Sequence, residues 1–401
     1  MVKVYSKALA RYIEVDRIIG HIRGEMHGPT LVFSAGIHGN EPSGIFALYN
    51  VLGELRRKNV KLRGSIYALS GNLTALQKGE RYINHDLNRL WTKKILHKLL
   101  SERPYAHDDD SLQQLDIYHT IKDILKSEKG PFYFMDLHTT SCETKPFLTV
   151  NDTILNRKYT SQYPLPIILG IEEYLVGPLL NYINELGYVA FGYEGGQHDA
   201  LDAIENHESF IYLSLAFSGC INPADIEFDK HYQKLTALSG DRDEFYEIFY
   251  RYQIEEQESF KMKAGFKNFQ TVKKGTELAL SNGKIVPAKK TSLIFMPLYQ
   301  NQGDDGFFCI RKIPKVFLTL STVFRKVRLD KLLTLLPGIS WGSPFKDTLA
   351  VNKKIARFFA RDLFHLLGYR GKYIDKDHII MKSREVASRN DEYSEERWNK
   401  K

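Results

Sequence analysis

The chain contains little cysteine and lacks any long uncharged apolar run. Three cysteines, Cys142, Cys220 and Cys309, are scattered through 401 residues and form no C-x-x-C pair. This spacing argues against a structural thiolate zinc site and against a disulfide framework. No apolar run approaches the ~18 residues that a membrane-spanning helix needs, so no membrane span is expected. Residues 1–5 lack the apolar core of a secretory signal peptide, and we expect a cytoplasmic protein.

A surplus of charge is absent from most of the chain. The formal net charge is +8 at pH 7, but residues 325–401 hold 18 Lys and Arg against 10 Asp and Glu. The rest of the chain has 38 residues of each sign and is neutral. The basic character is thus confined to the C-terminal segment, and it supports neither an acidic substrate nor a nucleic-acid partner.

Strand-like and helix-like patterns alternate through the N-terminal part of the chain. Strands are predicted at 17–24, 30–35, 64–70, 132–138, 146–150 and 189–193, and helices from Pro42 and at 109–129, 172–186, 200–217 and 241–258. The segment 71–91 has the pattern of a long polar loop. This order predicts an α/β fold in which helices flank a largely parallel or mixed sheet. Functional sites in such sheets lie at the carboxyl ends of strands.

Composition divides the chain into three predicted units, as its length suggests. Residues 1–259 form the α/β unit. Residues 260–324 alternate apolar and polar side chains between turns, which predicts a small antiparallel β domain. Residues 325–401 form a basic, partly helical extension, with an amphipathic helix predicted at 352–368 and a frayed end from about residue 381.

Two histidines and a glutamate have the spacing of a catalytic zinc site. His38 and Glu41 follow the predicted strand 30–35, and His138 ends the strand 132–138. Two histidines and one carboxylate leave one position of a zinc tetrahedron open, which is typical of catalytic rather than structural zinc. We therefore predict one zinc ion per chain. We place Asp136 on the opposite face of the strand from His138 and assign it to the support of the following loop.

Each of these residues, taken alone, has an ordinary structural explanation. An acid such as Glu41 is favourable near a helix N-terminus, and a histidine at a strand end is commonly just hydrogen-bonded. The combination of His38, Glu41 and His138 with Glu194, at the end of another predicted strand, favours a functional site.

Four short motifs occur in a distinctive order: G-x-H-G-N-E at 36–41, D-L-N-R at 86–89, D-L-H-T-T at 136–140 and E-G-G-Q at 194–197. They resemble those of the succinylglutamate desuccinylase/aspartoacylase family, within the zinc carboxypeptidase-like superfamily. The resemblance covers about residues 15–310, including the β unit. It implies zinc at His38, Glu41 and His138 and a catalytic role for Glu194.

The chemistry of amide hydrolysis suggests roles for these candidates. Glu194 would take a proton from water and return it to the leaving amine. Arg89 would bind a substrate carboxylate or stabilise the oxyanion, with a structural salt bridge as the alternative. Asn88 would hydrogen-bond the substrate, or act only as a turn residue. Tyr299, from the β unit, is a further substrate-binding candidate.

Nearby residues receive plainer assignments. Arg81, Asn84 and His85 are expected to shape the loop before the D-L-N-R motif, and His198 to be a surface histidine. No second substrate-binding arginine is evident, so N-acetylaspartate and N-succinylglutamate themselves are not assigned as substrates.

The predicted function is zinc-dependent hydrolysis of a non-peptide amide bond, in an N-acyl amino acid or a similar small amide. One alternative is a zinc carboxypeptidase acting on peptides, and another is a zinc-binding protein of the same fold without catalysis. Homo-oligomers are left open. The basic segment 325–401 either packs on the enzyme with solvated charges or binds an acidic partner. Truncation after about Arg325 is expected to preserve zinc ligation if the remainder folds.

Overall fold

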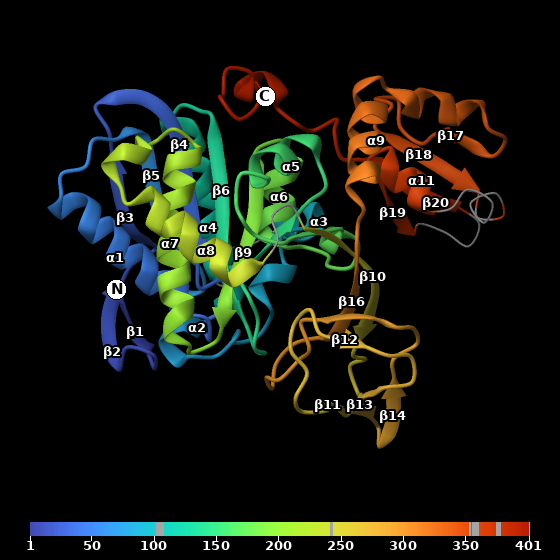
Figure 1. The fold of residues 1–401 in the computed structure, drawn as a ribbon, viewed down its shortest axis with the longest axis horizontal. Coiled ribbons are helices and arrows are strands. Elements are labelled where there is room, and N and C mark those ends of the chain that lie inside the picture. The colour runs from blue at the N-terminus through green and yellow to red at the C-terminus, as the bar shows by residue number, and fades with distance from the viewer. Residues whose placement is uncertain (102–107, 241–243, 353, 355–360, 374–377, 401) are drawn as a thin grey trace.

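The computed structural model describes every residue except 102–107, 241–243, 353, 355–360, 374–377 and 401. At its centre lies a twisted sheet with helices on both faces (Figure 1). Within the described residues this sheet has eleven strands in the order β12-β15-β16-β10-β8-β7-β9-β6-β4-β5-β3. In chain order these are β3 (Ile18–Arg23), β4 (Met26–Ala35), β5 (Arg63–Ser70), β6 (Phe132–Thr140), β7 (Phe147–Val150), β8 (Ile167–Leu169), β9 (Val189–Gln197), β10 (Phe245–Gln253), β12 (Thr271–Val272), β15 (Ser292–Phe295) and β16 (Asp305–Lys312).

The sheet is mixed, as the sequence predicts. Strand β4 runs parallel to β5 and β6, and β6 runs parallel to β9. Strands β3 and β7 are antiparallel to their neighbours β5 and β9. The carboxyl ends of β4, β6 and β9 therefore meet at one edge of the sheet, and the candidate site residues follow from these three strands.

Side-chain alternation along the strands builds a core on each face of the sheet. Leu31 and Phe33 of β4 pack in one core with residues of α1 and α7, whereas Val32 packs in the other with residues of α4 and α6. The helices of this part are α1 (Ser43–Arg57), α2 (Leu73–Lys78), α3 (Lys93–Ser101), α4 (Asp109–Ser127), α5 (Ile154–Thr160), α6 (Leu179–Glu185), α7 (Leu201–Phe217) and α8 (Phe228–Ser239). Among the described helices, none combines the length and apolar character needed to cross a membrane.

One predicted helix is wrong. Residues 241–243 of the predicted helix 241–258 lie outside the described residues, and Phe245–Gln253 form strand β10. Phe245, Tyr246 and Ile248 are aromatic or β-branched, and such side chains favour strands. Pairing with β8 and β16 provides hydrogen-bond partners for the backbone N–H and C=O groups of this segment. The predicted loop 71–91 also contains the short helix α2 and a 3-10 turn at Leu87–Arg89.

The small β unit shares strands with the large sheet. Strands β11 (Phe260–Met262), β13 (Glu277–Ser281) and β14 (Lys284–Pro287) form a separate three-stranded sheet. Strands β12, β15 and β16 instead extend the large sheet. The large sheet therefore contains strands from both sides of residue 260. A separate domain at 260–324 stays a prediction. At the N-terminus, β1 (Val2–Ser6) and β2 (Arg11–Val15) pair as a hairpin.

The C-terminal part, predicted to be partly helical, contains strands as well as helices. We define the C-terminal module as residues 315–383. Its elements are α9 (Lys315–Lys326), a 3-10 turn (Leu329–Leu335), β17 (Ile339–Trp341), β18 (Thr348–Asn352), α11 (Arg361–Leu366), β19 (Tyr369–Tyr373) and β20 (His378–Ser383). The strands form an antiparallel sheet in the order β17-β18-β20-β19. The predicted helix 352–368 is confirmed only in α11, since Asn352 ends β18 and residues 353 and 355–360 lie outside the described residues.

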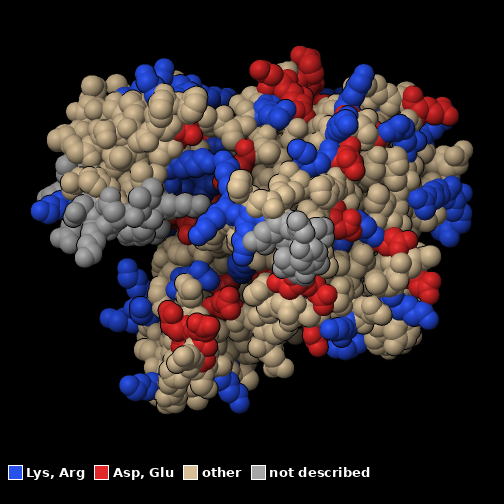
Figure 2. All heavy atoms as spheres, turned by 180° about the vertical axis from the view of Figure 1, so that it is seen from behind, with Lys and Arg blue, Asp and Glu red and all other residues tan. Residues whose placement is uncertain are grey.

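The expected frayed end is wrong, because the last residues pack against the large sheet. Tyr393 and Trp398 are buried in the core that contains α1 and α7. The Tyr393 hydroxyl accepts a hydrogen bond from the Val189 backbone N–H at 3.0 Å and donates one to the Phe132 carbonyl. Trp398 Nε1 donates to the Tyr133 hydroxyl at 3.1 Å. This tail closes the N-terminal ends of β6 and β9. Between the C-terminal module and the rest of the molecule, Figure 2 shows a hollow in which Lys and Arg atoms gather.

Candidate metal centre and catalytic site

The loop after β4 brings His38 and Glu41 to the carboxyl edge of the sheet. Gly36 starts this loop with a φ of +68°, a conformation that side-chain-bearing residues rarely adopt. A Cβ on Gly39 would lie 2.1 Å from the Ala75 carbonyl carbon, so glycine allows the loop to approach α2 closely. Pro42 then caps α1 without a side-chain hydrogen bond. The short G-x-H-G-N-E motif thus encodes a sharp exit from the strand.

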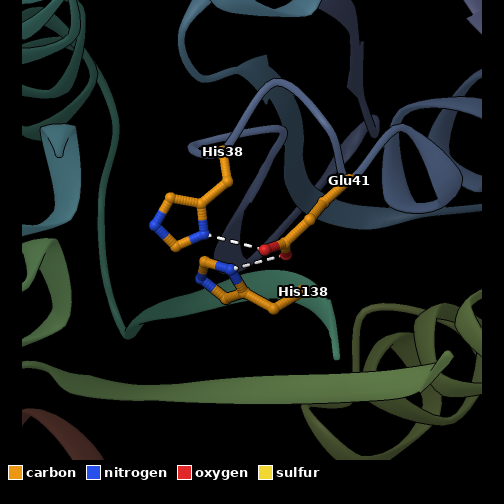
Figure 3. A group of neighbouring side chains, drawn as sticks. All are labelled: His38, Glu41 and His138. Carbon is orange, nitrogen blue, oxygen red and sulfur yellow. Dashed lines mark hydrogen bonds and ion pairs between the residues drawn. The ribbon is translucent and has the colours of Figure 1, made fainter. Parts of the chain in front are cut away.

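His38, Glu41 and His138 converge in the structure (Figure 3). Glu41 lies between the two rings, with Oε1 2.9 Å from His38 Nδ1 and Oε2 3.2 Å from His138 Nδ1. Candidate ligand atoms of the three residues all lie within 4.8 Å of one another. The Thr139 backbone N–H also donates to Glu41 Oε2 at 2.9 Å. The predicted ligand set therefore comes together as one buried group.

Two further acids hold the outer nitrogens of these histidines. His38 Nε2 lies 3.1 Å from Asp86 Oδ1, and His138 Nε2 lies 2.7 Å from Asp136 Oδ2. A proton on each Nε2 leaves both Nδ1 lone pairs directed toward Glu41. An acid behind a histidine in this way fixes its tautomer and orientation for metal binding.

The charge balance fits a bound cation. Burial opposes ionisation of Glu41, but His38 and His138 outweigh it and hold the pKa of Glu41 well below its usual value. Burial would lower the pKa of His138, yet Asp136 and Glu41 raise it well above its usual value. Three carboxylates, Glu41, Asp86 and Asp136, thus surround the two imidazoles and are only partly offset by Arg81, and a divalent cation bound by His38, Glu41 and His138 would add positive charge to this acidic group.

The predicted placement of Asp136 is wrong. Asp136 lies two residues before His138 in β6, and residues two apart in a strand share a face. It is fully buried, and Ser34 Oγ donates to its Oδ1 at 2.6 Å while its Oδ2 contacts His138. The two-residue alternation of side chains along a strand already predicts that Asp136 and His138 share a face.

Arg81 is a site residue that the sequence analysis assigned to loop shape alone. Its Nη2 lies 3.1 Å from Asp86 Oδ2 and its Nη1 lies 3.5 Å from Glu41 Oε1. The side chain is mostly buried and lines the catalytic cavity. The position of Arg81 in the same loop as Asp86 was the one indication in the sequence that it belongs to the site. Only the fold shows that its guanidinium reaches Glu41.

Glu194 faces the metal group from the next strand. It is the register partner of His138 across β6 and β9, and it is buried. Its Oε2 has no hydrogen-bond partner within the described part of the chain. Burial is the main cause that raises the pKa of Glu194 to about 8, and the charge of Glu41 adds to it. A buried carboxyl with an unpartnered oxygen beside a metal group suits proton transfer.

A cavity of about 90 Å³ opens beside this group. Arg89 lines it, with Nη2 2.9 Å from Asp305 Oδ2 of β16 and Nη1 donating to the Asn88 carbonyl at 3.0 Å. Arg251 pairs with the other oxygen of Asp305. The side chains of Met296, Leu298 and Phe308 also lie on this wall. Arg251 therefore reaches this wall only through Asp305, whereas Arg81 is a second arginine that lines the cavity directly.

Two predicted substrate-binding residues do not line the cavity. Asn88 Oδ1 accepts a hydrogen bond from the Leu179 backbone N–H at 2.9 Å, which ties the motif to α6. The Tyr299 hydroxyl donates to the Lys263 carbonyl at 2.8 Å and accepts from the Phe266 backbone N–H at 2.9 Å. Both side chains are thus engaged in holding local structure, and a direct substrate contact by either stays a prediction.

His198 lies in the cavity wall rather than on the open surface. Its Nδ1 is 2.7 Å from Thr139 Oγ1 and its Nε2 is 3.1 Å from Gln300 Oε1. Burial lowers its pKa. Asn40 Nδ2 donates to the same Gln300 oxygen at 2.8 Å. His198 therefore connects the strand that carries His138 to the small β unit.

Comparisons with known proteins agree with this geometry. Residues 27–203 match the family model described as succinylglutamate desuccinylase/aspartoacylase catalytic domain. A succinylglutamate desuccinylase from Pseudomonas fluorescens is 45% identical over 65 residues, which cover 16% of this chain and 19% of that relative. The chain thus aligns with about a fifth of the relative's length.

Solved structures resemble the fold. A succinylglutamate desuccinylase/aspartoacylase from Rhodobacter sphaeroides aligns with a TM-score of 0.53 at 14% identity, covering 73% of this chain and 88% of that chain. A succinylglutamate desuccinylase from Chromobacterium violaceum aligns with a TM-score of 0.51 at 16% identity and the same coverage. These alignments establish a shared architecture.

Proposed function

We propose that this chain is a zinc-dependent hydrolase of a non-peptide amide bond, because residues 27–203 match the catalytic-domain model of the succinylglutamate desuccinylase/aspartoacylase family. The substrate class is an N-acyl amino acid or a similar small amide. The observation that carries the proposal is the buried His38–Glu41–His138 group with the unpartnered Glu194 carboxyl beside it. A cytoplasmic location remains a prediction from the sequence.

His38, Glu41 and His138 would hold the metal, and Asp86 and Asp136 would orient the two histidines. Zinc bound by two histidines and one carboxylate polarises a carbonyl group and makes water more acidic. The three ligands leave one position for water or substrate.

The protein's own residues supply proton transfer and binding. Glu194 takes a proton from the attacking water and passes it to the nitrogen of the leaving amine, so that one carboxyl acts as base and then as acid. Arg81, held by Asp86 and Glu41, contributes positive charge where the amide oxygen becomes negative. Arg89 binds the carboxylate of the substrate by exchanging its contact with Asp305 for the substrate's oxygens.

The size of the cavity is compatible with both substrate classes. A volume of about 90 Å³ accommodates a compact acyl group or the terminal residue of a peptide whose remaining chain lies in solvent. The zinc carboxypeptidase alternative is therefore tested by experiment.

The test is an activity screen of zinc-loaded protein against N-acyl amino acids and short peptides, with Glu194→Gln as the control. We expect wild-type protein to release free amine from N-acyl amino acids and the control to be nearly inactive. Preferential release of C-terminal residues from peptides would instead support the carboxypeptidase. Zinc-loaded protein that hydrolyses neither class would support a binding protein without catalysis.

A further inference from the structure

A second cavity, of about 380 Å³, lies between the large sheet and the C-terminal module. Arg157 of α5, Arg311 and Lys312 at the end of β16, and Arg325 of α9 contribute to its lining. Asp152, which also lines it, follows the end of β7, and β7 is antiparallel to β9. The cavity therefore lies toward the start of β9, away from Glu194, and it is separate from the catalytic cavity.

Three buried guanidinium groups share the single carboxylate of Asp152. Arg157 Nε lies 3.1 Å from Asp152 Oδ1, while Arg325 Nη2 and Arg370 Nη2 lie 2.8 and 2.7 Å from Oδ2. The side chains of all three arginines are less than a tenth exposed. One carboxylate cannot balance three buried cations, because uncompensated buried charge is costly.

Other acids complete the balance for two of these arginines. Glu385 Oε1 lies 2.9 Å from Arg325 Nη1, and Glu173 Oε1 lies 2.5 Å from Arg370 Nη1. These two carboxylates approach from outside the cavity lining. Arg325 and Arg370 therefore each have a carboxylate in addition to their share of Asp152.

Arg157 depends on Asp152 for its direct ion pair, and Ser321 Oγ lies 3.2 Å from its Nη2. Asp152, Glu173 and Glu385 supply three carboxylates for the three buried guanidiniums, so the cluster is balanced. Burial lowers the pKa of Arg157 to about 10, with Arg325 and Arg370 adding to the effect and Asp152 and Glu385 opposing it. Arg157 lines the cavity and adds a cationic hydrogen-bond donor to its wall.

The rim of the cavity carries two more cations. Arg311 Nε lies 2.6 Å from Glu247 Oε1, and Lys312 Nζ lies 2.8 Å from Glu244 Oε1. Arg311 and Lys312 are 52% and 57% exposed, and ion pairs at such exposed positions contribute little stability. These side chains can therefore exchange a surface contact for the oxygens of a ligand.

The lining combines charged and apolar residues. Its charged members are five basic residues, Arg157, Arg311, Lys312, Arg325 and Arg370, and two acids, Asp152 and Glu247. Its apolar members are Leu169, Ile313, Pro314, Phe317, Leu318 and Leu366. Phe317 is 52% exposed, although large aromatic side chains usually gain stability from burial. The cavity thus offers both charge and apolar surface to one molecule.

We propose that this second cavity binds a small organic oxyanion, a carboxylate or a phosphate monoester that bears an aliphatic chain. Arg157, Arg311 and Lys312 contact the oxygens, and Phe317 and Leu318 cover the chain. The site is independent of the proposed hydrolase activity, since no metal-group residue or Glu194 lines it.

The test is calorimetric titration of the full chain with hexanoate, hexyl phosphate and inorganic phosphate. The cavity variant is Arg311→Gln/Lys312→Gln, and the charge-matched control is Lys261→Gln/Lys284→Gln on the three-stranded sheet. We expect saturable binding of hexanoate or hexyl phosphate, weakened ~10-fold or more in the cavity variant, the usual scale for charged hydrogen bonds. The control should bind as wild type does. A response to hexanoate alone identifies a carboxylate site, and a response to hexyl phosphate alone identifies a phosphate site.

A second variant tests the apolar wall. Phe317→Ala removes an exposed side chain, so the fold should be retained. It should weaken binding of the two chain-bearing ligands and leave inorganic phosphate, which already binds more weakly, unchanged. Absence of saturable binding by all three probes would overturn the proposal. So would binding that is equally strong in wild type and in both cavity variants, because the ligand would then occupy another part of the molecule.

Discussion

Asp136 and His138 lie on the same face of β6, with 2.7 Å between Asp136 Oδ2 and His138 Nε2. This contact directs His138 Nδ1 toward Glu41, so that an acid two residues away in the chain sets the orientation of a proposed zinc ligand. Asp86 makes the corresponding contact with His38 from a different loop. Each of the two proposed histidine ligands therefore has a carboxylate that fixes its orientation.

Asp136→Asn tests the importance of this support. The amide keeps the size of the side chain but removes its charge, so His138 loses the partner that fixes its tautomer. We expect zinc affinity or turnover to fall ~10–100-fold, as is usual when an outer partner of a metal ligand is lost. Competition with a fluorescent chelator measures the affinity. Ser34→Ala, which removes a hydrogen bond to Asp136 but no charge, should have the smaller effect, and an equal effect would contradict the charge-based explanation.

Metal content tests the ligand set itself. Purified protein should contain about one zinc per chain, the amount expected for one set of three protein ligands. His38→Ala/His138→Ala should contain none, whereas His198→Ala, a change in the same cavity wall, should retain zinc. Elemental analysis by mass spectrometry gives the stoichiometry. Zinc that persists in the double variant would place the metal elsewhere.

Glu194→Gln separates metal binding from proton transfer. The variant should retain zinc and lose at least ~100-fold in turnover, the scale of general acid–base catalysis. The base must be ionised, so activity should rise with pH along an acidic limb. Burial and Glu41 raise the pKa of Glu194 to about 8 in the metal-free protein, and a bound cation opposes this shift. The midpoint of this acidic limb in the pH–rate profile should therefore lie at or below pH 8. The residual activity of Glu194→Gln should show no such limb. Turnover close to wild type would assign the base to another residue.

Arg89→Gln tests recognition of the substrate carboxylate. Loss of a hydrogen bond to a charged group costs ~1.5–3 kcal/mol, so KM for N-acyl amino acids should rise at least ~10-fold. The control substrate is the same N-acyl amino acid with its free carboxylate replaced by a carboxamide. The KM for this substrate should differ little between Arg89→Gln and wild type. Asp305→Asn releases Arg89 from its ion pair and should lower KM for the acid. Equal effects on the acid and amide substrates would leave Arg89 with a structural role alone.

The C-terminal tail should be required for stability. Trp398→Ala should lower the free energy of unfolding by ~3–5 kcal/mol, as for other large buried aromatic residues. Tyr393→Phe should cost ~1–3 kcal/mol, because the Val189 backbone N–H and the Phe132 carbonyl lose a partner at a buried position. Urea denaturation followed by circular dichroism measures both. Exposed Tyr12→Phe is the control and should unfold as wild type does.

The same packing changes the expectation for truncation. Removal of all residues after Arg325 would delete Tyr393, Trp398 and Arg370, each of which is buried against the large sheet or in the ionic group around Asp152. We now expect this truncated chain not to fold. A truncated protein with a cooperative unfolding transition and bound zinc would show that the tail is dispensable.

Local patterns in the sequence predicted the elements that carry the metal group. Strands with continuous apolar runs, such as β4 and β6, are recognisable because both faces are buried. His38 and His138 could be picked out because each follows such a run, and parallel strands bring their carboxyl ends to one edge. The prediction of a helix at β10 is wrong because the strand conformation of this segment is stabilised by pairing with β8 and β16. These partners are distant in sequence, so no local pattern indicates them.

The sequence by itself determined the α/β order, the identity of the proposed ligands and the confinement of excess charge to residues 325–401. Tertiary structure alone decided which side chains complete each site. Arg89 meets Asp305 across 216 residues of chain, and Trp398 reaches Tyr133 across 265. Such contacts depend on which surfaces the fold buries together, and burial is the main cause of the raised pKa of Glu194 and of the lowered pKa of Arg157. A pattern of neighbours along the chain cannot encode these energies, because they arise only when distant segments exclude water from the same space.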